Sequence, residues 1–427
     1  MLVIGVLASA IFVFVRCFVR HKERVQLSCV LVLVLFWSIG WLAIVQLESM
    51  GGRESGTYGS DAAYYFERMA NASKDDAPLL AALEGPSRGY VAFGTLILLT
   101  SPFESIVWVN LANILSLILA LSFIYWLLRE RDIRPKVSLL ILTLMGFNGI
   151  ITWMVLRNLK DTLFVSTSLL EMIVLYHLFH PREFVALRNV ALSVLLAFFF
   201  GCIVSTIRPW GMVFSGSILL SMLLGAFFEG HVRRAHFFLM LVFGGLLFFI
   251  SLDWLASSME TYKVFQKYNQ EPSVLVTGLP SPTQILLIPL RFLMGPGIVR
   301  PLYPDQAFQA TTMTGNILIF LGSMVWWSLL PILFLTLAHP VSRIMRNLAV
   351  TGPALFFLCV YSYGYAGTAD TRTRAVFYLL SAPLIGSYIE DTFRCSLSTG
   401  QARVLTYSAL LTILVCLGTI VSYMTLG

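Results

Sequence analysis

Charged residues are scarce in this sequence of 427 residues: Asp, Glu, Lys and Arg make up 12% of the chain, whereas 58% of its residues are hydrophobic. A water-soluble domain exposes far more charge, and one core cannot bury so much apolar surface. The net charge of +7 would suggest nucleic acid in a soluble protein, but the basic residues here mostly lie in short segments between apolar runs. The composition therefore predicts a membrane protein and no nucleic-acid partner.

Apolar residues form continuous runs, for example over 25–46 and 106–128. Because a bilayer core of about 30 Å requires roughly 20 apolar residues per helix, each such run predicts a membrane-spanning helix. The expected fold is all-α, a polytopic transmembrane bundle forming a single integral-membrane domain over 1–427. About twelve spans are expected, near 2–19, 25–46, 106–128, 137–156, 162–180, 187–207, 210–228, 236–254, 313–336, 348–366, 375–390 and 404–424.

The loops between these spans fall alternately into two groups, one of which is short and basic. The positive-inside rule makes the basic group cytoplasmic and places both termini outside. The segments 47–105 and 255–312 then become two large external loops, with interfacial helices expected near 90–100 and 284–294. The basic segments are 20–24, 129–136, 181–188, 229–235, 338–347 and 391–403.

Neither external loop contains a cysteine or a histidine. This absence argues against a disulfide framework outside the membrane, and it means that an external site must work without imidazole chemistry. The sequence also has no Gly-rich loop followed by Lys of the kind that binds nucleotide phosphates. A reaction on the external side therefore has to take its energy from the substrate that donates the transferred group.

Cations in the tight external turns run against the usual distribution of charge in membrane proteins. Arginine presents a planar set of donors that fits phosphate oxygens, so these turns suggest a site for a lipid-linked diphosphate. The alternative is that they reach ordinary anionic headgroups. The catalytic candidates in these turns are Arg157, Lys160, Asp161, Arg208, Asp370, Arg372 and Arg374, with Trp210 as a substrate-binding candidate.

The first external loop adds an acid followed by aromatic residues: Asp61, then Tyr64 and Tyr65. A carboxylate can act as general base on a sugar hydroxyl, and tyrosine rings stack on sugars. The alternative is a solvated or helix-capping aspartate. In the second loop, Arg291 and Arg300 are candidates for glycan binding.

Four strings carry a family resemblance: the early external Asp61 with its tyrosines, FNGIITWMVLRNLKDTL at 147–163, IRPWG at 207–211 and GTADTRTR at 367–374. Together they resemble bacterial oligosaccharide repeat-unit polymerases, which make O-antigen or exopolysaccharide, and related GT-C-like membrane glycosyltransferases. The resemblance implies a polyprenyl-diphosphate-linked oligosaccharide as substrate, the outer face of the bacterial inner membrane as location, and other polysaccharide-assembly membrane proteins as partners. The paired Asp-Glu motif of the better-defined GT-C enzymes is missing, so we expect no cofactor, and a divalent metal stays an alternative that no clear motif supports.

The sequence thus predicts a glycosyltransferase in which a glycan hydroxyl attacks the anomeric carbon of a polyprenyl-diphosphate-linked sugar while the cations stabilise the departing diphosphate. Two other classes remain open. A flippase for the same lipid-linked oligosaccharide would place charge at mid-depth in the membrane, where Glu171 is the main candidate. A membrane acyltransferase would be expected to use an embedded histidine.

Overall fold

The computed structural model describes most of the chain. The described residues are 1–50, 59–157, 159–179, 187–208, 210–250, 288–290, 292–295, 312–334, 347–364, 371–394 and parts of 399–417. The expected interfacial helix near 284–294 falls partly outside these residues, because 284–287 and 291 are not among them. Among the described residues all regular secondary structure is helical, which confirms the all-α fold class.

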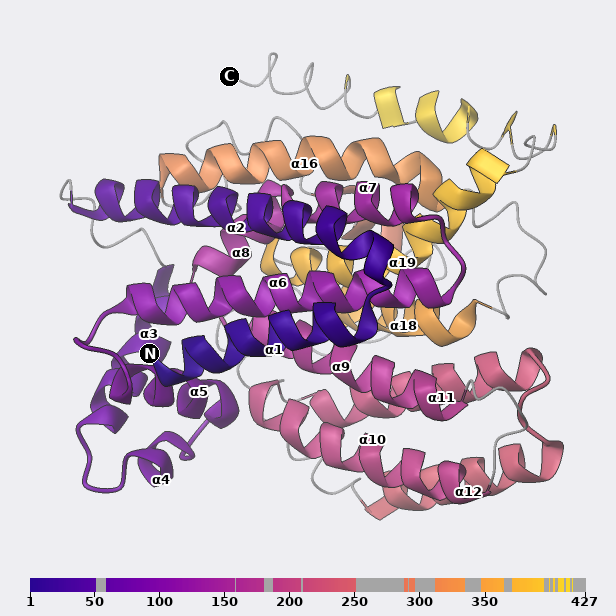
Figure 1. Ribbon diagram of the computed structural model, residues 1–427, viewed down its shortest axis with the longest axis horizontal. Coiled ribbons are helices and arrows are strands. Elements are labelled where there is room, and N and C mark those ends of the chain that lie inside the picture. Colours follow the sequence, from indigo (N-terminus) through magenta and orange to yellow (C-terminus); the bar gives the residue numbers. More distant parts are fainter. Residues whose placement is uncertain are drawn as a thin grey trace. The chain divides into compact units, whose positions relative to one another are not determined.

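The helices are long where the sequence is continuously apolar and short where polar residues interrupt it (Figure 1). Their bounds are α1 Leu2–Phe18, α2 His21–Met50, α3 Gly59–Ser73, α4 Pro78–Ala82, α5 Arg88–Leu99, α6 Ile106–Glu130, α7 Pro135–Gly146, α8 Gly149–Leu156, α9 Asp161–Phe179, α10 Leu187–Ile207, α11 Gly211–Phe228, α12 Arg234–Ile250, α16 Met313–Phe334, α18 Leu348–Gly364 and α19 Thr371–Arg394.

Within the described residues, five helices are long and apolar enough to cross a membrane: α2, α6, α9, α11 and α16. The pair α7 and α8 brings the number to six if the two are counted as one bent span. The remaining apolar helices, among them α1, α10, α12 and α18, offer shorter apolar stretches. The structure therefore supports a multi-pass helical membrane protein, and the count of about twelve spans stays a prediction.

The chain divides into two compact units. Unit 1 comprises residues 1–166, 296–339 and 370–427, and unit 2 comprises 167–295 and 340–369. In unit 1, α1 packs on α6, α3 packs on α5, and α8 packs on both α16 and α19. In unit 2, α11 packs between α10 and α18.

The expected single span at 137–156 is broken at Phe147–Asn148, where α7 and α8 meet at a bend of 54°. The cause is local, because Asn148 caps α8: its Oδ1 accepts hydrogen bonds from the backbone N–H groups of Ile150 at 2.9 Å and Ile151 at 3.2 Å. Asparagine at this position satisfies the unpaired donors of a new helix. The break directs the short helix α8 toward the connection that carries Arg157 and Lys160.

Two glycines allow α8 to lie against α16. A Cβ atom on Gly149 would be 1.9 Å from the backbone oxygen of Leu318, and a Cβ atom on Gly322 would be 2.2 Å from the backbone nitrogen of Ile150. Both obstacles are backbone atoms, which cannot move aside as a flexible side chain can. Small residues permit this kind of close helix approach in membrane proteins.

We expect Gly149→Ala to lower the stability of the protein in detergent by about 1–3 kcal/mol, because the added methyl group overpacks the crossing of α8 and α16. The matched control is Gly40→Ala on α2, where an added Cβ meets nothing within 4 Å. Thermal unfolding of the two purified variants measures the difference. Equal midpoints would show that the crossing tolerates a larger separation.

Two groups of polar contacts in unit 1 lie at opposite ends of α6. At the end of α6, Arg129 donates to both carboxylate oxygens of Glu23 at 2.9 Å, and Arg134 pairs with Glu390 of α19 at 2.8 Å. Near the start of α6, the Met1 amino group donates to the Thr100 hydroxyl at 3.1 Å. The 25 residues of α6 separate the two groups by about 37 Å.

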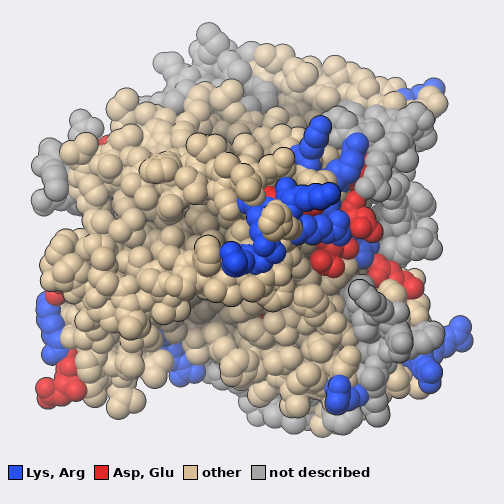
Figure 2. Space-filling model, viewed as in Figure 1, with Lys and Arg blue, Asp and Glu red and all other residues tan. Residues whose placement is uncertain are grey.

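One of these ends carries two of the basic loop segments, and the assignment of that end to the cytoplasm stays a prediction. The segments 20–24 and 129–136 share one end of unit 1 with the C-terminal part of α19. Lys and Arg side chains gather with acidic side chains in one cluster, over the place where α1 turns into α2 (Figures 1 and 2). Most of the remaining face in this view carries neither charge.

Candidate functional site

The helices α3, α4 and α5 form a small packed layer against α6 and α1, and this layer positions the candidate acid. Its core contains buried Tyr65, Met69 and Tyr90 together with Val109 and Ala112 of α6. The phenol of Tyr90 accepts a hydrogen bond from Asn113 Nδ2 at 3.1 Å, and both residues are fully buried. These contacts anchor the helices α3 and α5 to α6. A helix is present where one was expected near 90–100, namely α5, and its interfacial location stays a prediction.

Asp61 lies in the first turn of α3, where a carboxylate also favours the positive end of the helix. Its Oδ2 forms an ion pair with Nη1 of Arg372, the second residue of α19. The side chains are 43% and 27% exposed, so the pair remains accessible. The structure thus brings together two predicted site residues that are 311 positions apart in the sequence.

A second contact joins Lys160 to the same layer. Lys160 Nζ donates to the hydroxyl of Ser87 at 2.6 Å and lies 5.4 Å from the centre of the Tyr65 ring. The Tyr65 hydroxyl is 3.2 Å from the same Ser87 oxygen. Ser87 precedes α5 with a left-handed backbone (φ 55°, ψ 32°), and this turn holds its side chain between the lysine and the tyrosine.

Electrostatics at this contact favour negative charge. Burial raises the pKa of the Tyr65 phenol, but the Lys160 ammonium and the hydrogen bonds from Lys160 and Ser87 outweigh burial and hold this pKa below its ordinary value. The Asp61 charge acts in the opposite direction on Tyr65, as expected for two nearby acids. A cationic environment of this kind is suited to an anionic group of a ligand.

Tyr64 presents the aromatic surface of the site. Its side chain is 46% exposed, its ring centre lies 5.6 Å from that of Tyr65, and the guanidinium of Arg68 lies 5.6 Å from its ring centre. Arg68 also donates to the backbone oxygens of Glu84 and Pro86. This arginine therefore links α3 to the turn that precedes Ser87.

The other charged residues near the site have different surroundings. The Arg157 guanidinium lies 5.8 Å from the centre of the Trp153 ring, and Asp161 is 1% exposed at the first position of α9. Arg374 is 4% exposed, one turn before the buried Tyr378. Arg374 is therefore embedded in the packing of unit 1, unlike Arg372.

Arg372 and Arg374 are two positions apart, so both could reach one diphosphate only if their segment were irregular or extended. The segment is instead the first turn of α19. Two residues that are two positions apart on a helix point about 200° away from each other. Arg372 therefore pairs with Asp61, while Arg374 is directed into the protein.

In unit 2, Arg208 follows α10 and is 7% exposed. Its Nη1 donates to the Tyr361 hydroxyl at 2.6 Å, and its guanidinium lies 5.3 Å from the Tyr361 ring. Trp210 precedes α11 directly and is half-buried. The turn is tight, since a Cβ atom on Gly211 would lie 2.3 Å from the backbone nitrogen of Ser205. Arg208 and Trp210 thus belong to unit 2, whereas Asp61 and Arg372 belong to unit 1.

Three predicted site residues, Asp370, Arg291 and Arg300, lie outside the described residues. The described part of the chain contains no group of three His, Cys, Asp or Glu residues placed to hold a metal ion. The expectation that the protein needs no metal stays a prediction.

Ser87 and Arg68 were not among the expected site residues. The sequence Gly85-Pro86-Ser87 indicates a turn, and Gly85 does adopt a positive φ of 68°. A turn alone does not show which side chain it presents, so the contact with Lys160 became visible only in three dimensions.

A search for matching protein families, curated relatives and solved structures found no match. The fold by itself defines the class, a helical membrane protein with several apolar spans. Any more specific function has to be argued from the residues of the site.

Proposed function

We propose that this protein is a membrane glycosyltransferase of the polymerase type, acting at the outer face of the bacterial inner membrane. It transfers glycan from a polyprenyl-diphosphate-linked donor to a hydroxyl of a glycan acceptor. The observation that carries the proposal is the accessible pair of Asp61 and Arg372 beside the exposed ring of Tyr64. A base, a phosphate-binding cation and a sugar-stacking surface are the parts that such a transfer requires.

The reaction assigns one role to each group. Asp61 accepts the proton of the acceptor hydroxyl while its oxygen attacks the anomeric carbon of the donor sugar, and the bond between that carbon and the diphosphate oxygen breaks. Arg372 and Lys160 stabilise the negative charge that develops on the leaving diphosphate. The proton therefore ends on Asp61 and the electron pair on the diphosphate.

The ion pair also suggests an order of binding. The Asp61 carboxylate is held by the Arg372 guanidinium, so one of its oxygens is occupied before a ligand binds. A diphosphate that binds Arg372 competes with Asp61 for the same donors and so makes the carboxylate available. Donor binding before acceptor binding is the sequence of events that this arrangement favours.

The full topology belongs to the same proposal. About twelve spans with both termini outside would place Asp61, Lys160 and Arg372 on the outer face, in agreement with their location at one end of unit 1. The ion pairs of Glu23 and Arg134 would then lie on the cytoplasmic side. In this topology the growing lipid-linked glycan reaches the site from the outer side of the membrane.

Unit 2 offers an apolar groove suited to an isoprenoid chain. The groove has a volume of about 530 Å³ and runs along α11 from Met212 to Leu224, with walls from α10, α12 and α18. Arg208 precedes Met212, which lines the groove, by four residues in the sequence. The apolar walls suit one hydrocarbon chain, so we assign an isoprenoid lipid chain to this groove.

The groove assignment predicts that Gly216→Leu weakens binding of an isoprenoid lipid roughly tenfold, or about 1.4 kcal/mol, because the leucine side chain occupies space that the lipid chain fills. Gly216 lines the groove, and a Cβ atom there meets nothing within 4 Å, so leucine fills the space without disturbing the helix. Gly40→Leu is the control, because Gly40 is equally open and lies on α2. Binding of a polyprenyl phosphate to each purified variant in detergent measures the effect, and equal affinities for both variants would contradict the assignment.

The decisive cellular experiment is the size distribution of surface and lipid-linked glycan in cells that lack the gene. We expect long chains to collapse to single repeats and to return when the wild-type gene is restored. Unchanged chain lengths would contradict polymerisation.

Transport is the second candidate, and one observation favours it. Glu171 is fully buried in α9; Ser215 donates to one of its carboxylate oxygens, and the other makes no hydrogen bond among the described residues. An ionisable group inside a helix bundle is typical of transporters. The same deletion separates the two functions: loss of a flippase retains lipid-linked units on the inner leaflet, whereas loss of a polymerase accumulates them on the outer leaflet.

A further inference from the structure

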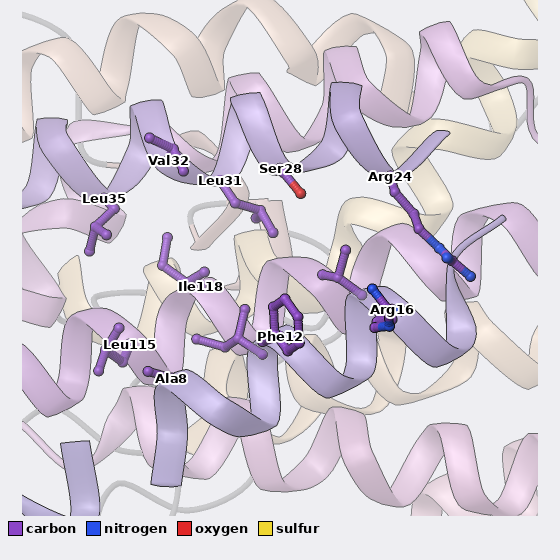
Figure 3. Close-up of a pocket in the computed structure, with 12 residues that line it drawn as sticks. Ala8, Phe12, Arg16, Arg24, Ser28, Leu31, Val32, Leu35, Leu115 and Ile118 are labelled. Atoms are coloured by element: carbon purple, nitrogen blue, oxygen red, sulfur yellow. The ribbon is translucent and has the colours of Figure 1, made fainter. Parts of the chain in front are cut away.

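A second groove lies in unit 1, between α1, α2 and α6 (Figure 3). It has a volume of about 370 Å³. One side is formed by residues of α1 from Ala8 to Arg16, the other by residues of α2 from Arg24 to Leu35, and the floor by Leu115 and Ile118 of α6. The groove is separate from the pair of Asp61 and Arg372 and is not required by the proposed reaction.

Both cations of the groove lie at the same end. Figure 3 shows Arg16 and Arg24 together at one end, with Leu35 and Leu115 at the other. Arg16 is in the last turn of α1 and Arg24 in the first turn of α2, so the short turn between these helices brings them together. The positive end is the end of unit 1 at which Glu23 and Arg129 form their ion pair.

The two arginines of the groove differ from Arg129 in having no carboxylate partner. Arg129 is paired with Glu23, which also accepts a hydrogen bond from Tyr125 at 2.7 Å. Among the described residues no carboxylate lies within ion-pair distance of Arg16 or Arg24, and the Arg24 Nε–H donates to the backbone oxygen of Val19 at 2.9 Å. Two neighbouring guanidinium groups without a counter-ion favour an anionic ligand.

The rest of the groove is aliphatic or aromatic and contains Phe12, Leu31, Val32 and Ile118, with Ser28 as its one uncharged polar residue. Such walls offer too few hydrogen bonds for a glycan or a nucleotide, and they do not favour water. Phe12 and Val32 are 65% and 47% exposed, so the groove opens on the apolar surface of these helices. The ligand must therefore combine an anionic head with a hydrocarbon chain.

We infer that this groove binds an anionic phospholipid of the surrounding bilayer. Its phosphate lies between Arg16 and Arg24, and one acyl chain runs past Phe12 and Leu31 toward Leu35. Basic pockets between membrane helices are known to hold such headgroups. The lipid fills the space between α1 and α2, and it thereby attaches the first helix of the chain to the bundle.

The test compares two double variants with equal loss of charge. Arg16→Gln with Arg24→Gln removes both cations of the groove, whereas Arg20→Gln with Lys22→Gln removes two exposed cations of the same turn that do not line it. Binding of phosphatidylglycerol and phosphatidylcholine to each purified protein in detergent is measured by native mass spectrometry. We expect wild type and the second double variant to bind phosphatidylglycerol preferentially, and the first double variant to bind it at least tenfold more weakly.

A third variant tests the hydrocarbon part independently of charge. Ala8 lines the apolar end, so Ala8→Leu shortens the groove, and we expect it to weaken phosphatidylglycerol binding while both arginines remain. Equal loss in the two double variants would overturn the inference, as would equal binding of phosphatidylcholine by wild type. Displacement of phosphatidylglycerol by a polyprenyl diphosphate that depends on Arg16 and Arg24 would also overturn it, since the groove would then belong to the donor.

Discussion

Asp61→Asn is expected to reduce glycosyl transfer by about 10²- to 10⁴-fold, which is the usual contribution of a positioned general base. Asparagine keeps the shape of the side chain and its place in α3, but it cannot accept the proton of the acceptor hydroxyl. Transfer from a lipid-linked donor by protein purified in detergent provides the measurement. Donor binding should persist, because Arg372 and Lys160 are unchanged.

The fold should survive this substitution. Asp61 and Arg372 are both partly exposed, and ion pairs of this kind contribute at most about 1 kcal/mol to stability. Asp76→Asn is the matched control, because Asp76 is exposed in the connection between α3 and α4. Full activity in both variants would exclude Asp61 as the base.

The second large effect is expected for Arg372→Ala, which should lower transfer at least a hundredfold and weaken donor binding. The guanidinium binds phosphate oxygens through two parallel hydrogen bonds, and alanine removes both of them together with the charge. Arg372→Lys should restore part of the activity, because lysine retains the charge but lacks the paired geometry. In cells, Arg372→Ala should fail to restore long glycan chains.

Two comparisons separate this effect from misfolding. Lys22→Ala removes a cation from the opposite end of unit 1 and should leave transfer unchanged. Arg374→Ala should instead decrease the amount of folded protein, because Arg374 is 4% exposed and its removal leaves a gap in the packing. Wild-type transfer activity in Arg372→Ala would show that this residue does not bind the diphosphate.

Hydropathy and turn residues predicted most of the helices, because a membrane span depends on local composition. They did not predict the break between α7 and α8, although its signal is present in Asn148 and Gly149. The continuous apolar character of 137–156 concealed it. Asn148 could either continue one long helix or cap a new one, and in the structure it caps α8.

The sequence offered candidate residues for the site but not their contacts. Lys160 and Arg372 were proposed because cations are unusual in the expected external turns, and Asp61 because tyrosines follow it. The contacts of these residues depend on how α3, the turn before α5 and α19 are arranged. Ser87 has an ordinary side chain and becomes important through its position beside Lys160. Arg374 is buried whereas Arg372 is partly exposed, and a spacing of two residues in the sequence does not show this difference.

The distance between Asp61 and Arg372 along the chain has a consequence for biogenesis. Membrane helices are inserted from the N-terminus as the chain is synthesised, and domains generally form in that order. Asp61 therefore leaves the ribosome long before its partner does, and it has no guanidinium beside it until α19 is in place. A truncated or stalled chain that ends before residue 371 has Asp61 without Arg372, and under the proposed function we expect such a chain to transfer little glycan from lipid-linked donor.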